Sequence, residues 1–152
     1  MMQSHRISVL APLGLSMVAL VCTMIIHLLP LKATVNLIRR ERSRGHVGAP
    51  WTALGIFARV VFYAALGHLL EMGFWAVLFM ICGEFSDFGT AFYHSAVNYT
   101  SLGYGDLIMT PSWRLLGPLE TANGTLLFGV STAMIFAVML WLIQARYTDL
   151  KG

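Results

Sequence analysis

The sequence predicts an all-α membrane protein in which three helices cross the bilayer and one shorter helix enters it without crossing. Hydrophobic residues make up 57% of the 152 residues and charged residues only 11%, whereas a soluble domain carries about 25% charged residues. The mean hydropathy of +0.72 supports the same fold class. Three apolar stretches are long enough to span a bilayer, and a fourth, between the second and the third, is too short. The length fits one domain.

The first apolar stretch covers residues 7–29 and reaches about 35 Å as a helix, enough to cross the hydrocarbon core. An N-terminal signal peptide is the alternative, because Arg6 precedes the stretch. The stretch is longer than a signal core of about 7–15 residues and lacks a cleavage site between small residues. We therefore expect a retained transmembrane helix.

The segment 32–50 is predicted to be a basic loop that sets the topology. It holds half of the chain's ten basic residues, namely Lys32, Arg39, Arg40, Arg42 and Arg44. Short loops rich in Lys and Arg stay in the cytoplasm, which places the N-terminus outside and the C-terminus in the cytoplasm. The loop also has the composition to bind anionic lipid. Because the basic residues cluster beside a span, the net charge of +3 does not indicate a nucleic-acid partner.

The short helix is expected between the second and third spans. Ser86 and Asp87 are suitable N-cap residues, and residues 88–99 would then form a helix about 18 Å long, roughly half of the hydrocarbon core. Such a helix suits a re-entrant element that is shielded by protein.

The segment after this helix reads Thr100-Ser101-Leu102-Gly103-Tyr104-Gly105-Asp106. It resembles the selectivity filter of potassium channels, in which rings of backbone carbonyls replace the hydration shell of the ion. Gly103 and Gly105 adopt positive φ at little cost, so that successive carbonyls can face one axis. The resemblance implies that residues 100–105 coordinate potassium and that Asp106 lies at the outer mouth.

The resemblance extends from Asp87 to about Leu142 and is to the small prokaryotic potassium channels, here with one additional N-terminal helix. It divides the chain into residues 1–50, the first helix and basic loop, and residues 51–152, the pore module. The module comprises an outer helix (51–83), a pore helix (87–99), the filter (100–106) and an inner helix (119–146). One filter per chain implies a homotetramer in the cell membrane. The resemblance implies that potassium is the permeant ion, and we expect no cofactor, no other metal and no enzymatic activity.

The third span also resembles the inner helix of these channels. A glycine about 20 residues after their filter acts as a bend, and Gly124 occupies the corresponding position. Packing against a neighbouring helix is the alternative role for Gly124, although we favour a bend. Four residues share one helix face, which by the resemblance lines the cavity: Thr125, Phe128, Thr132 and Phe136. Val97 stands where some bacterial channels place a carboxylate that pairs with the aspartate of the filter.

Ionisable residues inside spans are costly and therefore point to specific roles. His68 and Glu71 lie three residues apart on one helix face, a spacing also found in helical metal sites. His27, the first span's only histidine, is expected near the opposite membrane boundary, which disfavours a metal site. We expect Glu71 to be a neutral hydrogen-bonding group that docks the second span on the pore helix. Glu120 is expected to brace the filter from behind.

Three alternatives remain open from the sequence. The first is a weakly selective cation channel, which only ion flux measurements distinguish from a selective one. The second is a metal-dependent membrane enzyme built on His68 and Glu71. The third is a potassium transporter subunit, but the single complete Gly-Tyr-Gly segment of this chain argues against it. The gating stimulus is not encoded in any recognisable segment.

Overall fold

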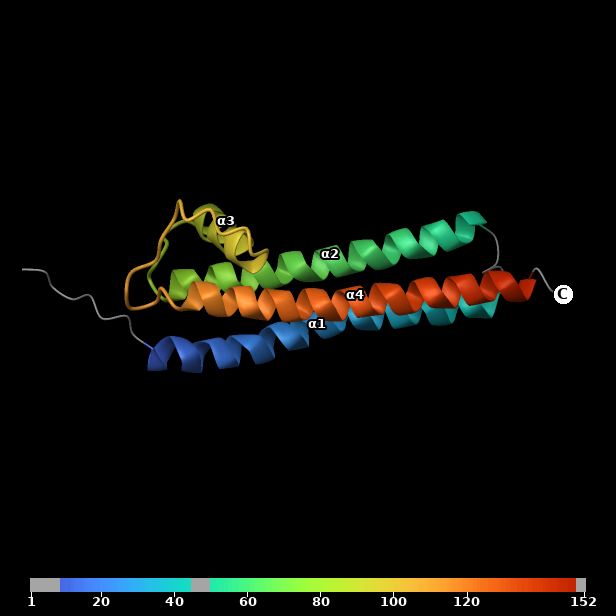
Figure 1. The fold of residues 1–152 in the computed structure, drawn as a ribbon, viewed down its shortest axis with the longest axis horizontal. Coiled ribbons are helices and arrows are strands. Elements are labelled where there is room, and N and C mark those ends of the chain that lie inside the picture. The colour runs from blue at the N-terminus through green and yellow to red at the C-terminus, as the bar shows by residue number, and fades with distance from the viewer. Residues whose placement is uncertain (1–8, 45–49, 150–152) are drawn as a thin grey trace, which may run out of the picture. The chain divides into compact units, whose positions relative to one another are not determined.

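The computed structural model describes residues 9–44 and 50–149, and the regular elements of the described chain are all helices. Its four helices are α1 (Leu10–Arg44), α2 (Pro50–Ile81), α3 (Phe88–Tyr99) and α4 (Leu116–Asp149), shown in Figure 1. Three of them, α1, α2 and α4, are long and apolar enough to cross a membrane. The expected fold class of three spans and one short helix is therefore confirmed.

The first helix is longer than expected. α1 continues without interruption to Arg44, so the prediction of a loop from residue 32 is wrong for residues 32–44. Hydropathy falls at Lys32, but Lys, Ala, Leu, Arg and Glu are good helix formers, so the helix outlasts the apolar stretch. Residues 7–8 of the expected span and 45–49 of the expected loop lie outside the described residues.

The bounds of the other helices differ from expectation by one to three residues. α2 covers Pro50–Ile81 against an expected 51–83. α3 begins at Phe88 with Asp87 as its N-cap, which matches the expected helix at 88–99 and is one residue shorter than the pore helix as bounded at 87–99. α4 starts at Leu116 rather than at residue 119. Pro118 therefore lies inside the first turn of α4, where a missing backbone N–H costs no hydrogen bond.

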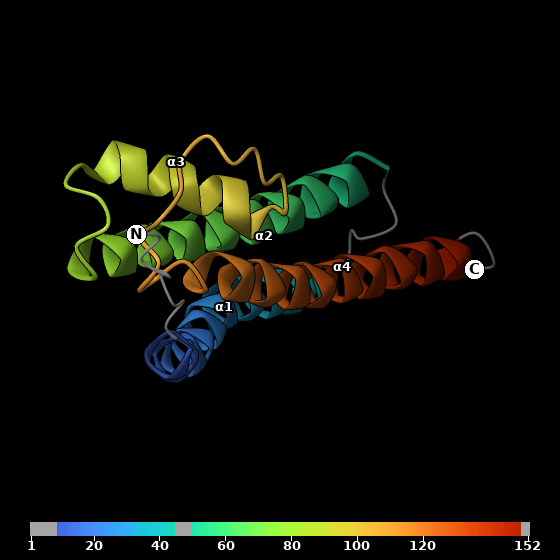
Figure 2. The ribbon, with the colours of Figure 1, turned by 60° about the vertical axis from the view of Figure 1, so that its left-hand side comes forward.

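By its internal contacts the chain forms two compact units, and each long helix contributes to both. The first unit contains α1 up to Ile26 together with Leu69–Leu127, and thus includes α3 and the predicted filter. Its core gathers Met72, Trp75 and Phe79 of α2 with Tyr99 of α3 and Leu116 of α4. Figures 1 and 2 both show α3 alongside the C-terminal part of α2.

The second unit contains His27–His68 and the chain from Phe128 onward. Its core is formed by Leu37, Ile56, Val60, Val138 and Leu142. Pro30 lies inside α1, and its ring contacts α2 at Gly67, where an added Cβ would come within 2.7 Å of Pro30 Cγ. The absence of a side chain at Gly67 therefore lets the two helices approach closely at this point.

Candidate functional site

The helix α3 is fixed at both ends by specific hydrogen bonds. At its start, the Asp87 side chain accepts from the backbone N–H of Thr90 at 2.8 Å, as expected of an N-cap. At its end, the N–H of Ser101 donates to the Asn98 carbonyl and the N–H of Leu102 to the Val97 carbonyl, both at 2.9 Å. These two bonds form a Schellman motif, which leads directly into the predicted filter.

The backbone of the predicted filter alternates in conformation. Positive φ values occur at every second residue: 62° at Ser101, 61° at Gly103 and 72° at Gly105. When left-handed and right-handed residues alternate, successive N–H groups turn to one side and the carbonyls to the other. Ser101 holds a position that glycine or asparagine usually occupies, and a non-glycine residue there costs about 1–3 kcal/mol. The geometry of residues 100–106 thus resembles a strip of backbone with its carbonyls turned to one side, and we call this segment the strip.

The end of this strip carries a carboxylate that is held by α3. The Tyr93 hydroxyl donates to Asp106 Oδ2 at 2.7 Å, and the Leu107 N–H donates to Oδ1 at 3.1 Å. The hydrogen bond from Tyr93 lowers the pKa of Asp106 below its usual value, so the carboxylate stays ionised at neutral pH. The residue of α3 that holds the Asp106 carboxylate is thus Tyr93. Val97 stands at the position where some bacterial channels place an acidic partner for this aspartate.

Two buried carboxyl groups, those of Glu71 and Glu120, contact α3. The Tyr99 hydroxyl donates to Glu71 Oε2, which connects the end of α3 to α2. The Ser95 hydroxyl lies 2.6 Å from Glu120 Oε1 and 2.9 Å from the Met72 carbonyl oxygen. The contact of Glu71 with α3 is the one that the sequence analysis expected, and Ser95 is the partner of Glu120 that it left unidentified.

His94 of α3 is buried and packs against aromatic side chains rather than projecting into solvent. Its ring centroid lies 4.9 Å from that of Phe85 and 5.4 Å from that of Phe79. Its Nε2 is 2.9 Å from Asn98 Nδ2. Burial lowers the pKa of His94, although Asp106 and Glu84 act in the opposite direction. The imidazole is therefore neutral at neutral pH, which fits a packing role.

Gly124 of α4 is a point of close contact with α3. An added Cβ would lie 2.4 Å from the Tyr99 carbonyl oxygen and 3.1 Å from the Tyr99 ring. No real Cβ tolerates the first distance, so only glycine fits while α3 keeps its place. The structure thus gives Gly124 the packing role that the sequence analysis held as the alternative to a bend.

The four residues that the resemblance assigns to the cavity are all on α4. Each of Thr125, Phe128, Thr132 and Phe136 is exposed in the single chain. The hydroxyls of Thr125 and Thr132 bond to the carbonyls one turn earlier on their own helix, at 2.9 and 2.8 Å. An exposed face of this kind is available to line a space shared with other copies of the chain.

His68 belongs to a buried polar cluster in the second unit. Its Nε2 lies 3.0 Å from the Ser131 hydroxyl, which is also 3.3 Å from Nε2 of His27. The two imidazole centroids are 5.4 Å apart. The expectation that His27 lies away from His68 is wrong, because the two imidazoles meet in this cluster and His27 lies at the middle of α1. Imidazole is the commonest metal ligand, so His27 and His68 are candidate ligands for a metal ion.

We expect Glu71→Gln to be tolerated much better than Glu71→Leu. Glutamine still accepts a hydrogen bond from Tyr99, whereas leucine removes that acceptor from a buried hydroxyl at a cost of about 1–3 kcal/mol. Thermal unfolding of the purified protein in detergent measures the difference. Combining Glu71→Leu with Tyr99→Phe should recover part of the loss, because no buried hydroxyl then remains. Equal damage from Gln and Leu would contradict a hydrogen-bonding role.

Comparison with known proteins gives one finding that bears on this geometry. A family model described as "Ion channel" matches residues 60–140, just over half of the chain. The match covers most of α2, all of α3 and the strip, and most of α4. Neither the curated proteins nor the solved structures gave a match.

Proposed function

This chain belongs to the ion-channel family, and we propose that it conducts potassium selectively through a filter formed by Thr100–Asp106. The observation that carries the proposal is the alternation of positive φ at Ser101, Gly103 and Gly105. It occurs in a Gly-Tyr-Gly segment directly after a short helix that lies between two spans. Backbone carbonyls turned to one side are the ligands with which potassium filters replace water.

One chain supplies only one strip, so we propose that four copies surround the ion path. The strip is exposed in the single chain, with Leu102 53% and Tyr104 67% accessible, which fits a surface that other copies cover. Thr125, Phe128, Thr132 and Phe136 then line the inner cavity, and four ionised Asp106 carboxylates surround the outer mouth. Crosslinking in native membranes should give species up to the tetramer.

The direct test is ion flux in liposomes. Purified protein should carry potassium at least about tenfold faster than sodium, because the carbonyl spacing suits the larger ion. Empty liposomes and a protein with Gly105→Ala are the controls. Equal potassium and sodium fluxes would instead identify a weakly selective cation channel. The complete absence of flux would reject the proposal and reopen a metal-dependent activity at His68 and Glu71, which metal analysis of the protein would examine.

We propose that the protein resides in a prokaryotic cell membrane with its N-terminus outside and its C-terminus in the cytoplasm. The support is the basic composition of residues 32–44, which favours the cytoplasmic side. The strip then opens outward at Asp106, as potassium filters require.

Cysteine labelling tests this orientation at two exposed serines. We expect Ser43→Cys to react with an impermeant reagent only from the cytoplasmic side and Ser112→Cys only from outside. The unmodified protein, which retains Cys22 and Cys82, is the control for background labelling. Labelling of position 43 from outside would invert the chain and exclude a filter that faces outward.

A further inference from the structure

A polar cavity lies between α1 and α2 in the second unit, and no residue of the predicted filter lines it. It has a volume of about 310 Å³, and its lining includes Asn36, Arg40 and Glu41 of α1 with Arg59 and Tyr63 of α2. Arg40, Glu41 and Arg59 precede the part of the chain that matches the ion-channel family, residues 60–140. The cavity is therefore formed by the additional N-terminal helix together with α2.

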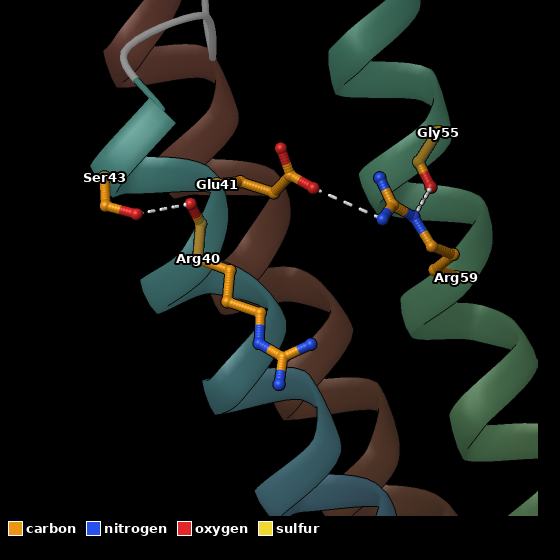
Figure 3. A network of polar contacts seen from close by, with 5 residues as sticks. All are labelled: Arg40, Glu41, Ser43, Gly55 and Arg59. Carbon is orange, nitrogen blue, oxygen red and sulfur yellow. Dashed lines mark hydrogen bonds and ion pairs between the residues drawn. The ribbon is translucent and has the colours of Figure 1, made fainter.

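One side of the cavity holds an arginine in a fixed position. Arg59 Nε donates to the Gly55 carbonyl at 3.0 Å, and Arg59 Nη1 pairs with Glu41 Oε1 at 3.3 Å, as Figure 3 shows. The Glu41 side chain is only 8% exposed, whereas that of Arg59 is 45% exposed. A guanidinium has five N–H donors, so these two contacts orient the group and leave donors available to a ligand.

The other cation of the cavity is Arg40, which is exposed and one residue before Glu41. Figure 3 shows its guanidinium extending away from the Glu41 carboxylate, and among the described residues it makes no hydrogen bond or ion pair. Two guanidinium groups and one carboxylate leave the cavity with a net positive charge. Arginine forks match the oxygens of phosphate groups especially well, and Asn36 and Tyr63 add further hydrogen-bonding groups at the same cavity.

The surroundings of the cavity favour a lipid over a free anion. The cavity lies between two helices that are apolar enough to span a membrane, near the basic end of α1, where Arg39 and Arg42 are also exposed. Apolar side chains next to it along the helices are accessible, with Val35 40% and Phe62 63% exposed. A phosphate in the cavity would thus be beside surfaces that acyl chains can cover.

We propose that this cavity binds the phosphate group of an anionic phospholipid, with Arg40 and Arg59 as the anion-binding residues and Glu41 as the residue that positions Arg59. The site is independent of the proposed potassium pathway, because it uses none of the filter residues. It replaces the diffuse binding expected of a basic loop with a defined pocket on two helices.

The test measures lipid binding to the purified full-length protein, without any assay of ion flux. Delipidated protein in mild detergent is titrated with phosphatidylglycerol, with phosphatidylcholine of the same acyl chains, and with inorganic phosphate. Native mass spectrometry counts bound lipid, and thermal unfolding reports stabilisation. We expect phosphatidylglycerol to bind and stabilise at concentrations at which the other two do not.

Arg40→Gln is the informative variant, and Arg42→Gln is its matched control. Both remove one charge from an exposed position near the end of α1, but only Arg40 lines the cavity. Loss of one Arg near an anionic lipid should weaken binding about fivefold at position 40 and less than about twofold at position 42. Arg59→Lys, which keeps the charge beside Glu41 and removes the fork, should also weaken binding.

Three results would overturn the proposal. Equal losses from Arg40→Gln and Arg42→Gln would indicate diffuse attraction to basic charge. Equal binding of phosphatidylcholine would remove the requirement for an anionic lipid. Stabilisation by inorganic phosphate that matches that by phosphatidylglycerol would identify a site for a free anion.

Discussion

Gly105→Ala is expected to abolish selective potassium flux while leaving membrane insertion and assembly intact. Gly105 has φ 72°, and a left-handed conformation costs a residue with a Cβ about 1–2 kcal/mol. In the proposed tetramer every subunit carries this cost, which makes roughly 4–8 kcal/mol for one ring of four residues. The strip should therefore leave its alternating conformation. Potassium and sodium fluxes in liposomes measure the effect, and Gly103→Ala, at φ 61°, should behave alike.

Gly83→Ala is the matched control for this prediction. Gly83 also has a positive φ, 77°, and like Gly105 it has no atom within 4 Å of an added Cβ. It lies just after α2, outside the strip, so its substitution imposes the same backbone cost without altering a carbonyl ring. Selectivity that survives at Gly83→Ala and is lost at Gly105→Ala would tie the effect to the filter. Selective flux through Gly105→Ala would show that the filter assignment is wrong.

Gly124→Ala is expected to displace α3 and so remove most of the flux. The new Cβ would lie 2.4 Å from the Tyr99 carbonyl oxygen, and backbone cannot rotate away as a flexible side chain can. Overpacking of this kind costs about 1–3 kcal/mol or more. We expect a lower melting temperature in detergent together with at least a roughly tenfold fall in potassium flux.

Gly129→Ala provides the comparison on the same helix. An added Cβ at Gly129 meets no atom within 4 Å, and alanine is the better helix former by about 1 kcal/mol. This variant should therefore be neutral or slightly stabilising. If Gly124 served mainly as a bend, Gly124→Ala would alter gating without a loss of thermal stability, and the packing role would be contradicted.

The fold was largely predictable because its elements depend on local features of the sequence. Long apolar stretches predict spans, and Asp87 predicts the start of a short helix. The end of α1 was not predictable from hydropathy, because that quantity marks where the bilayer ends and not where the backbone stops being helical. The misplaced boundary also put His27 at the edge of the membrane instead of beside His68 and Ser131.

The candidate site was less predictable, because its contacts join residues far apart in the sequence. Nothing in the spacing of Tyr93 and Asp106 indicates that their side chains meet, and the valine at position 97 indicated only that an acidic partner for Asp106 is absent there. A glycine at position 124 is expected both in a helix that bends there and in a helix that packs closely against its neighbour. Only the distance to the Tyr99 carbonyl distinguishes the two roles.

The Schellman motif at the end of α3 makes the two halves of the strip mechanically unequal. The N–H groups of Ser101, Leu102 and Gly103 are all bonded to carbonyls of α3, so the inner half moves only if the helix itself frays. The outer half is connected to α3 through the side chain contact of Tyr93 with Asp106. A displacement of this loop would thus be opposed by backbone hydrogen bonds at residues 101–103 and by one side-chain hydrogen bond at Asp106. We therefore expect the Asp106 end of the strip to move more easily than the end attached to α3.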